Sequence, residues 1–332
     1  MWLLLRAEAT PETLLQALRA ESLEVRVHRL GDRWALEIQG NGHLSEAFAR
    51  YEEVERVFST HDIQPLVQQW SHNVELPTWQ RGKGLLWIAG PCSVERKADF
   101  LRLAQELRAI GVQVLRGGAF KARTSPYSFQ GMGQEALDWL FEAKSLTGLP
   151  ICVEVVSETH LPLYEHVDIL QIGARNMDDY WLLKAVAPLG KPVLLKRNPQ
   201  ATIEEWLLAA EYLLLYGTPW VLLCERGIRT FERSLRYTMD IGAIPAVQRK
   251  TRLPVIADPS HAAGRWDFVE PLALAAIGAG SEGLIVEVHP EPLKALSDAA
   301  QQLTIEQFQR LYERANAIYT VLSRHLSEPL QA

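Results

Sequence analysis

The segment Leu85-Leu86-Trp87-Ile88-Ala89-Gly90-Pro91-Cys92-Ser93 opens the part of the chain that decides the fold. Its first five residues are apolar without polar alternation, which is typical of a strand buried on both faces. Seven further runs rich in Val, Ile and Leu follow, at residues 112–115, 151–155, 169–172, 193–195, 220–224, 255–257 and 284–288. Amphipathic helical stretches separate the runs, with capping pairs at Thr202/Glu205 and Thr304/Gln307. Eight strands alternating with helices predict an α/β protein with a closed (β/α)₈ TIM barrel over residues 85–332.

The first 70 residues follow a different pattern. Expected strands cover residues 2–5, 23–28, 34–38 and 54–59, and expected helices cover residues 11–20 and 44–52. This β-α-β-β-α-β order is that of a small ferredoxin-like α+β domain. We interpret residues 71–84, which contain a proline and two glycines, as a linker.

Composition excludes several classes of protein. The 332 residues are 48% hydrophobic and 22% charged, which is typical of a globular protein. A formal charge of −6 argues against a general nucleic-acid binder, although a local cluster of cations can still bind phosphate. No apolar stretch has the length of a signal-peptide core or a membrane span. Three cysteines are too few, and odd in number, for a disulfide framework, so we expect a cytoplasmic protein that does not bind membranes.

Polar side chains follow the apolar runs, at the strand ends where barrels of this kind carry their chemistry. The cations at these ends are Arg116, Lys121, Arg175, Lys196 and Arg226. The richest segment, residues 116–131, also carries Arg123 among glycines and hydroxyls, and such a loop can wrap an anion. A lone cation in a turn is usually just solvated. So many cations at one barrel mouth repel one another unless an anion or carboxylates offset them, which favours an anion site.

Cys92, His261 and Glu287 lie at the ends of strands one, seven and eight, which are neighbours in a closed barrel. Together they suit a first-row divalent ion such as Mn²⁺, Fe²⁺, Co²⁺ or Zn²⁺ better than Mg²⁺ or Ca²⁺. No short ligand spacing supports such a site, and a lone cysteine is more often a small buried hydrophobe. Residue chemistry alone leaves both interpretations equally open. Glu154, inside the third run, could equally be a structural partner of the cations.

The strand-end segments resemble 3-deoxy-D-arabino-heptulosonate 7-phosphate (DAHP) synthase, most closely its type I-beta branch, in which a ferredoxin-like domain precedes the barrel. The resemblance rests on segments in family order at residues 90–93, 116–131, 172–176, 194–197, 224–230, 258–261 and 285–290. It covers the barrel, and the N-terminal unit by pattern only. It implies a metal-dependent condensation of phosphoenolpyruvate with erythrose 4-phosphate and water, releasing phosphate. This transferase reaction is the entry to the shikimate route, which leads through chorismate to aromatic amino acids.

The resemblance also assigns ligands. One divalent ion per subunit would bind Cys92, His261, Glu287 and Asp298, the last identified by the resemblance alone. Phosphoenolpyruvate would contact Arg116, Lys121, Arg175, Lys196 and Arg226. Erythrose 4-phosphate would contact Arg123 and Thr124, with Ser125 close by.

Catalytic roles are expected for Lys121, Lys196, Glu154 and His261. In our mechanistic hypothesis Glu154 holds the water that adds to phosphoenolpyruvate, and Lys196 donates a proton. The family usually has Pro where this chain has Ala122, and losing that fixed φ would leave the loop less preorganised.

Three alternative functions compete with this one. A sister synthase joins phosphoenolpyruvate to arabinose 5-phosphate, giving 3-deoxy-octulosonate 8-phosphate, and typically has Asn between the Lys and the Arg-Ser of this loop. Residues 121–124 lack that Asn, which favours the four-carbon sugar. A Schiff-base aldolase would use Lys196 as its nucleophile. A phosphate-sensing module with an inactive barrel is disfavoured by the intact set of polar strand ends.

The N-terminal unit is harder to interpret. In the type I-beta branch this domain is associated with feedback inhibition by an aromatic amino acid, and the family suggests a homotetramer. Nothing in residues 1–59 identifies a ligand, so regulation and oligomerisation both remain open as its role.

Overall fold

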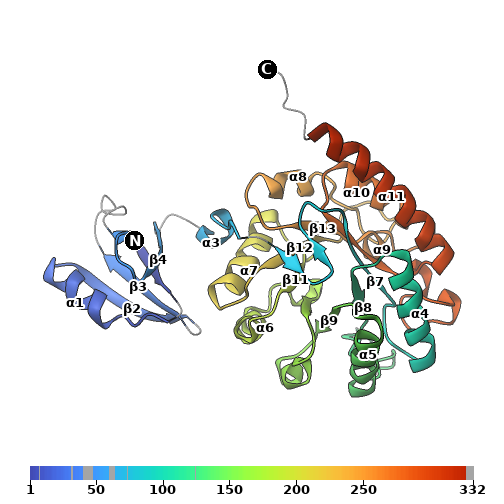
Figure 1. The fold of residues 1–332 in the computed structure, drawn as a ribbon, viewed down its shortest axis with the longest axis horizontal. Helices are drawn as coiled ribbons and strands as arrows, with labels where there is room; N and C mark the ends of the chain where they lie inside the picture. Colours follow the sequence, from blue (N-terminus) through green and yellow to red (C-terminus); the bar gives the residue numbers. More distant parts are fainter. Residues whose placement is uncertain are drawn as a thin grey trace.

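A computed structural model describes residues 1–6, 8–30, 33–39, 48–59, 64–72, 74–123 and 125–326. Figure 1 shows a small N-terminal sheet beside a large barrel, with α3 (Pro65–Gln68) between them. None of the described helices combines the length and apolarity needed to cross a bilayer. Cys92, Cys152 and Cys224 are buried and form no disulfide with one another.

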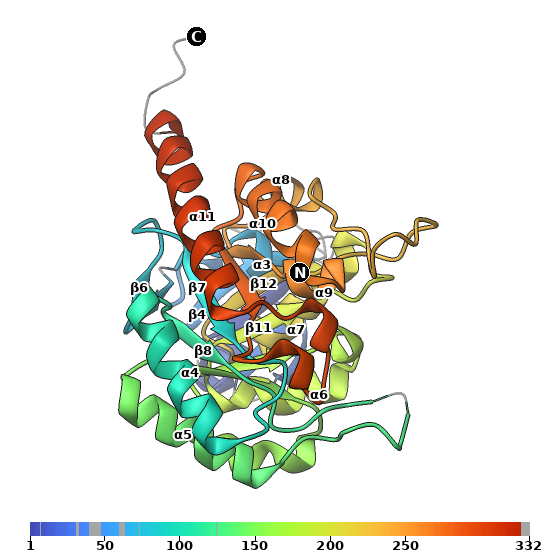
Figure 2. The same ribbon diagram turned by 90° about the vertical axis from the view of Figure 1, so that its right-hand side faces the viewer.

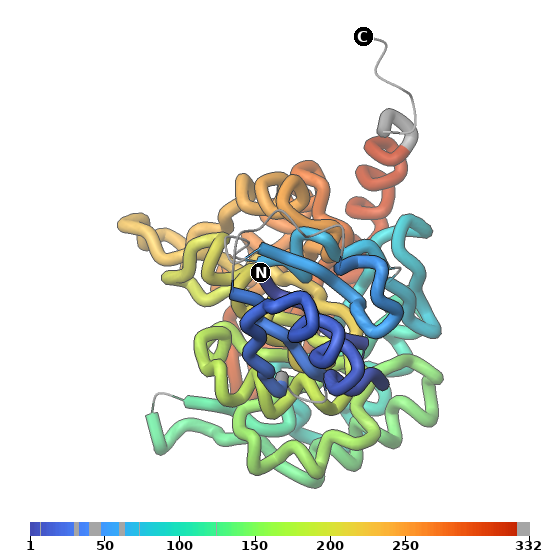
Figure 3. The backbone as a smooth tube through the Cα atoms, turned by 90° about the vertical axis from the view of Figure 1, so that its left-hand side faces the viewer, coloured from blue at the N-terminus to red at the C-terminus, as the bar shows by residue number. Residues whose placement is uncertain are grey.

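The N-terminal sheet contains β1 (Trp2–Leu5), β2 (Glu24–Leu30), β3 (Arg33–Gln39) and β4 (Val54–Phe58) in the order β2-β3-β1-β4, with antiparallel neighbours. Helix α1 (Glu12–Ala20) packs its Leu14 and Leu18 on Leu3 and Leu36 of the sheet. Figure 3 shows this unit from the side opposite the barrel. The arrangement is consistent with a ferredoxin-like domain. The second helix expected there, at residues 44–52, lies mostly outside the described residues.

The predicted barrel is confirmed. Eight parallel strands close in the order β10-β11-β12-β13-β14-β7-β8-β9. They are β7 (Leu86–Gly90), β8 (Val114–Arg116), β9 (Ile151–Val155), β10 (Ile169–Ile172), β11 (Val193–Lys196), β12 (Val221–Glu225), β13 (Val255–Ala257) and β14 (Gly283–Glu287). Nearly every residue of these eight strands is buried, because one face of the sheet points into the barrel interior and the helices cover the other.

Helices surround the barrel (Figure 2). They are α4 (Lys97–Ile110), α5 (Gln134–Thr147), α6 (Tyr180–Val186), α7 (Ile203–Leu215), α8 (Ala243–Gln248), α9 (Pro259–Ala263), α10 (Val269–Gly278) and α11 (Ile305–Leu326). Only a 3₁₀ segment, Glu158–Tyr164, joins β9 to the next strand, β10. Both predicted capping boxes are confirmed, with Thr202 and Glu205 at α7 and Thr304 and Gln307 at α11.

The segment between the two bodies packs on the barrel. Residues 71–84, expected as a linker, include a hairpin of β5 (Glu75–Leu76) and β6 (Trp79–Gln80), and its Leu76 and Trp79 join the apolar cluster of the barrel. The exact domain boundaries stay a prediction. Before this hairpin, the backbone N–H groups of Leu66 and Val67 in α3 donate to the Glu211 carboxylate of α7, at 2.9 and 2.8 Å.

Glu211 makes this attachment pH-dependent. Burial raises the pKa of its carboxyl from 4.5 to about 7, although the two backbone hydrogen bonds act in the opposite direction. Between these two pH values the folded state binds more protons than the unfolded state, so this group lowers stability as pH rises from about 4.5 to 7. The Glu211 side chain therefore favours the folded state most in acid, where it is protonated, and least above pH 7, where it is a buried carboxylate.

We expect the Glu211→Gln variant to lack this pH dependence, because its amide does not titrate. The difference in thermal unfolding midpoint, wild type minus variant, should fall as the pH is raised from 5 to 7.5. Differential scanning calorimetry over that series measures it, and all other titrating groups cancel in the difference. A difference that is constant or grows with pH would contradict the assignment.

Candidate active site

A cavity of about 560 Å³ opens at the C-terminal ends of the barrel strands. The cations predicted from the strand ends all line it, together with three arginines from the loops. The lining cations are Arg116, Lys121, Arg123, Arg175, Lys196, Arg226, Arg229 and Arg236. Glu154, His261 and Asp298 also line the cavity, as does Ser125, whereas Thr124 lies outside the described residues.

A buried ion pair joins two strand ends at the floor of the cavity. Arg116 Nη1 of β8 lies 2.6 Å from Glu287 Oε1 of β14, and both side chains are almost fully buried. Burial opposes ionisation of Glu287, but the neighbouring His261, Arg116 and Lys121 lower its pKa to about 2. Gly90 of β7 lets the Arg116 backbone lie close beside it, because a Cβ there would lie 2.0 Å from the Arg116 carbonyl oxygen. The carboxylate is therefore charged and fixed.

Asp258 links His261 to Lys196. Its Oδ2 accepts from Lys196 Nζ at 2.5 Å and lies 2.7 Å from His261 Nδ1, while its Oδ1 accepts from the His261 backbone N–H. Burial alone would raise the pKa of Asp258, but His261 and Lys196 hold it well below its usual range. Burial lowers the pKa of His261 despite two nearby carboxylates, which favours a neutral imidazole with Nδ1–H on Asp258 and Nε2 facing the cavity.

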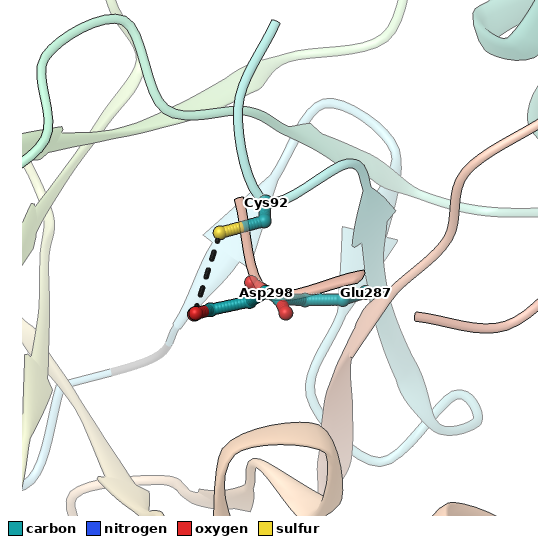
Figure 4. A group of neighbouring side chains, drawn as sticks. All are labelled: Cys92, Glu287 and Asp298. Atoms are coloured by element: carbon teal, nitrogen blue, oxygen red, sulfur yellow. Dashed lines mark hydrogen bonds between the residues drawn. The ribbon is translucent and has the colours of Figure 1, made fainter. Parts of the chain in front are cut away.

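Cys92, Glu287 and Asp298 lie together (Figure 4), with one candidate ligand atom from each residue within 4.8 Å of the others. Cys92 Sγ lies 3.6 Å from Asp298 Oδ2. His261 Nε2 is 3.4 Å from Glu287 Oε1 and 3.9 Å from Asp298 Oδ2. The structure thus brings three of the four candidate metal ligands together and places His261 beside two of them, Glu287 and Asp298. Burial, followed by the charge of Glu287, raises the pKa of the Cys92 thiol to about 12, so metal binding there must displace a proton.

Two polar residues that the sequence analysis missed support this cluster. Gln301 is buried, donates from Nε2 to Glu287 Oε2 at 2.6 Å, and accepts from Arg236 Nη1 at 3.1 Å. Gln302 accepts from the Cys92 backbone N–H at 3.0 Å. Asp258 was also missed as a site residue. Two adjacent glutamines after a candidate ligand, and an acid three residues before His261, were the available signals.

Several residues of the loop after β8 line the cavity. Lys121 Nζ lies 3.2 Å from Cys92 Sγ, and the Lys121 backbone N–H donates to the Gln130 carbonyl. Arg175 Nη1 donates to the Ala122 carbonyl at 2.5 Å. Arg123 Nη1 lies 4.0 Å from Asp298 Oδ1, at the edge of the metal-ligand cluster. The loop therefore contacts the cluster through Lys121 and Arg123, and the segment after β10 through the Ala122 carbonyl.

Glu154 and Arg226 complete the polar lining. The Glu154 carboxylate lies against Gly173, the residue that follows β10. A Cβ on Gly173 would be 2.0 Å from Glu154 Oε1. Arg226 is 5% exposed, and its Nε and Nη1 have no hydrogen-bond partner among the described residues. Unpaired buried donors that line a cavity are suited to an anionic ligand.

Asp258 should be essential for stability. We expect Asp258→Asn to lower the free energy of unfolding by about 3–5 kcal/mol, because it leaves the buried Lys196 ammonium without its carboxylate. Urea unfolding followed by tryptophan fluorescence measures this.

A matched control is Asp240→Asn. Asp240 Oδ2 lies 2.9 Å from Arg197, but Arg197 keeps Glu225 at 3.0 Å, and the Asp240 side chain is 28% exposed. Its loss should cost about 1 kcal/mol or less. Equal losses in the two variants would contradict the special position of Asp258.

The chain is similar to proteins of known family. A family model described as the DAHP synthetase I family matches residues 73–322. The phospho-2-dehydro-3-deoxyheptonate aldolase of Thermotoga maritima is 42% identical over 97% of this chain and 98% of its own length. The 2-dehydro-3-deoxyphosphooctonate aldolase of Syntrophobacter fumaroxidans is 32% identical over 71% of this chain and 87% of its own length.

Solved structures agree with these matches. The crystal structure of the Thermotoga maritima DAHP synthase superposes with a TM-score of 0.76 at 40% identity, covering 97% of this chain and 98% of the other. A truncated form of the Thermotoga maritima enzyme gives a TM-score of 0.73 at 42% identity, covering 79% of this chain and 98% of that form. Fold, site geometry and similarity over nearly the full length lead to one conclusion: the chain belongs to the DAHP synthetase I family.

Proposed function

We propose that the barrel condenses phosphoenolpyruvate with erythrose 4-phosphate and water to give 3-deoxy-D-arabino-heptulosonate 7-phosphate and phosphate. The observation that carries the proposal is a cavity lined by many cations, into which the Cys92–Glu287–Asp298 cluster opens through Asp298. The similarity to the Thermotoga maritima aldolase, which spans both parts of the chain, supports the same reaction.

The cluster fits one divalent ion. Cys92, Glu287 and Asp298 offer a sulfur and carboxylate oxygens, and His261 adds a nitrogen that burial keeps neutral. This donor set suits Mn²⁺, Fe²⁺, Co²⁺ or Zn²⁺. Such an ion, when bound, would supply Lewis-acid polarisation of the aldehyde oxygen. Asp258 hydrogen-bonds to the His261 ring and Gln301 hydrogen-bonds to the Glu287 carboxylate. Both candidate ligands are therefore oriented by residues outside the ligand set.

Phosphoenolpyruvate carries a phosphate and a carboxylate, and the cavity offers cations for both. We assign its binding to Arg116, Lys121, Arg175, Lys196 and Arg226, all of which line the cavity. Arg116 and Lys196 are buried beside carboxylates that keep them in fixed positions. Preorganised donors of this kind stabilise the charge that moves onto the departing phosphate.

We assign the aldehyde substrate to the loop side of the cavity. Arg123 and Ser125 line it, and Arg123 approaches Asp298 of the cluster. Erythrose 4-phosphate would thus bind with its aldehyde toward the cluster and its phosphate toward the loop. Thr124 is assigned to the same phosphate on the resemblance alone, because it lies outside the described residues.

In the reaction, the methylene carbon of phosphoenolpyruvate forms a bond to the aldehyde carbon, and the aldehyde oxygen takes up a proton. Positive character develops at the enol carbon, and water adds there. Glu154 lines the cavity beside the cations and is our candidate for holding that water, with Lys196 as a proton donor. The hemiketal phosphate that results then breaks its carbon–oxygen bond and releases phosphate.

For the N-terminal unit we propose a regulatory or oligomerisation role, with an aromatic amino acid as effector and a homotetramer as assembly. Its support is the resemblance to the type I-beta branch and the four-stranded antiparallel sheet that the N-terminal unit forms. Direct binding of tyrosine, phenylalanine and tryptophan to the full chain, with sedimentation analysis, addresses both roles.

Substrate choice tests the proposed reaction. With phosphoenolpyruvate and a divalent ion, we expect phosphate release to be much faster with erythrose 4-phosphate than with arabinose 5-phosphate. A phosphate-release assay with each aldehyde measures this. Faster turnover of the five-carbon sugar would favour the sister synthase, and borohydride trapping of the protein on substrate would favour a Schiff-base aldolase. No phosphate release with either sugar would favour a binding module.

The metal assignment is tested by Cys92→Ala. We expect this variant to lose bound metal and metal-dependent turnover, because it removes a ligand from a buried cluster. Metal content after dialysis and turnover with and without a chelator measure the effect. Cys152→Ala is the matched control, since it removes a buried thiol from β9 outside the cluster. Full turnover by Cys92→Ala in the presence of chelator would overturn the assignment.

A further inference from the structure

Arg226 is a deeply buried cation that lines the cavity. It follows β12, is 5% exposed, and leaves Nε and Nη1 unpaired within the described part of the chain. The other deeply buried cations that line the cavity, Arg116 and Lys196, have carboxylate partners at 2.6 and 2.5 Å. No described carboxylate lies within ion-pair distance of Arg226, so another group must hold its guanidinium in place.

The Tyr237 ring is the group that holds the Arg226 guanidinium. The guanidinium carbon of Arg226 lies 4.3 Å from the centre of the Tyr237 ring, within the range of a cation–π contact. The ring lines the same cavity and is half-buried. A flat aromatic face fixes a guanidinium from one side and here leaves its Nε and Nη1 unpaired, whereas a carboxylate would accept from such donors.

The Tyr237 ring is itself fixed by its backbone. Its N–H donates to the Ala262 carbonyl at 2.9 Å, and the next residue pairs with Ile228 in an antiparallel bridge. Gly227 has φ +96°, and a Cβ there would lie 2.6 Å from Tyr237 Cβ. The chain directly after Arg226 therefore requires glycine in order to pass against Tyr237.

Charge around the phenol agrees with this geometry. Burial would raise the pKa of Tyr237, but Arg226, which also hydrogen-bonds to it, and then Arg236 and Arg229 lower it overall. Arg236 lies farther from the ring, at 5.8 Å. The phenol thus sits among guanidinium groups, of which Arg226 is the closest to the ring centre.

We propose that Tyr237 is a positioning residue for phosphoenolpyruvate binding, which holds Arg226 against its ring so that Nε and Nη1 stay free for an anionic group of the substrate. The inference rests on the proposed function, because it takes Arg226 as a phosphoenolpyruvate ligand. Tyr237 acts through Arg226 and lies outside both the metal-ligand cluster and the aldehyde loop.

The test compares Tyr237→Leu with Tyr237→Phe in the full chain. We expect Tyr237→Leu to raise the KM and the calorimetric Kd for phosphoenolpyruvate about 2- to 30-fold, the range of a cation–π contact, with a smaller change in kcat and in the KM for erythrose 4-phosphate. Tyr237→Phe keeps the aromatic face and should retain most of the affinity. The thermal unfolding midpoint checks that each variant is folded.

A double-mutant cycle shows whether Tyr237 affects phosphoenolpyruvate binding through Arg226. In an Arg226→Ala background, adding Tyr237→Leu should weaken phosphoenolpyruvate binding no further, because the group that Tyr237 holds is gone. Tyr212→Leu is the matched control: it removes a tyrosine ring that lies 5.5 Å from Lys184 Nζ on the outside of the barrel, and it should leave affinity unchanged. Additive losses in the cycle, or unchanged affinity in a folded Tyr237→Leu, would overturn the inference.

The two proposals can fail separately. Calorimetry with phosphoenolpyruvate alone, and with inorganic phosphate alone, measures the Tyr237 effect without turnover. If wild type binds phosphoenolpyruvate but releases no phosphate with erythrose 4-phosphate, the proposed reaction fails while the role of Tyr237 is still decided by the binding data. If turnover is normal and Tyr237→Leu binds as wild type does, only the role of Tyr237 fails.

Discussion

The carboxylate of Asp258 accepts hydrogen bonds from both Lys196 and His261 at a depth where an isolated charge would be strongly destabilising. Beside it, Glu287 offsets Arg116 in the same way. These two carboxylates make it possible to bury cations at the ends of strands that are otherwise apolar. The candidate metal cluster depends on this constraint, because Asp258 holds the His261 ring and Glu287 is itself a candidate ligand.

The same arrangement divides the cations into two kinds. Arg116 and Lys196 are neutralised by the protein, so they are fixed before any ligand arrives. Arg226 keeps unpaired donors and rests on an aromatic ring. Asp298 adds backbone strain on the ligand side, since its φ of +46° lies in the left-handed region that Asp tolerates better than most residues. The cavity therefore combines cations that the protein holds in ion pairs with one cation, Arg226, that keeps unpaired donors.

Much of this could be predicted, and the exceptions have physical reasons. Apolar runs predict the barrel because strands covered on both faces need no polar alternation, and strand order then brings Cys92, His261 and Glu287 together. Asp298 came from the resemblance alone, since it lies in a loop with no periodic signal. Gln301 and Tyr237 were missed because their roles depend on which distant residue they contact. Ala122 is now less puzzling: its contact with Arg175 uses the backbone carbonyl, which proline would also provide.

A chain with a net charge of −6 can hold a cavity lined by eight Arg and Lys side chains because charges act mostly over short distances. Screening at physiological salt removes most of the effect of surface acids beyond about 8 Å, while the low dielectric inside the barrel strengthens the nearby pairs. Only Glu154 and Asp298 contribute carboxylates to the described lining of the cavity. The excess of cations there suits two phosphorylated substrates bound together, because each brings the negative charge that the lining lacks.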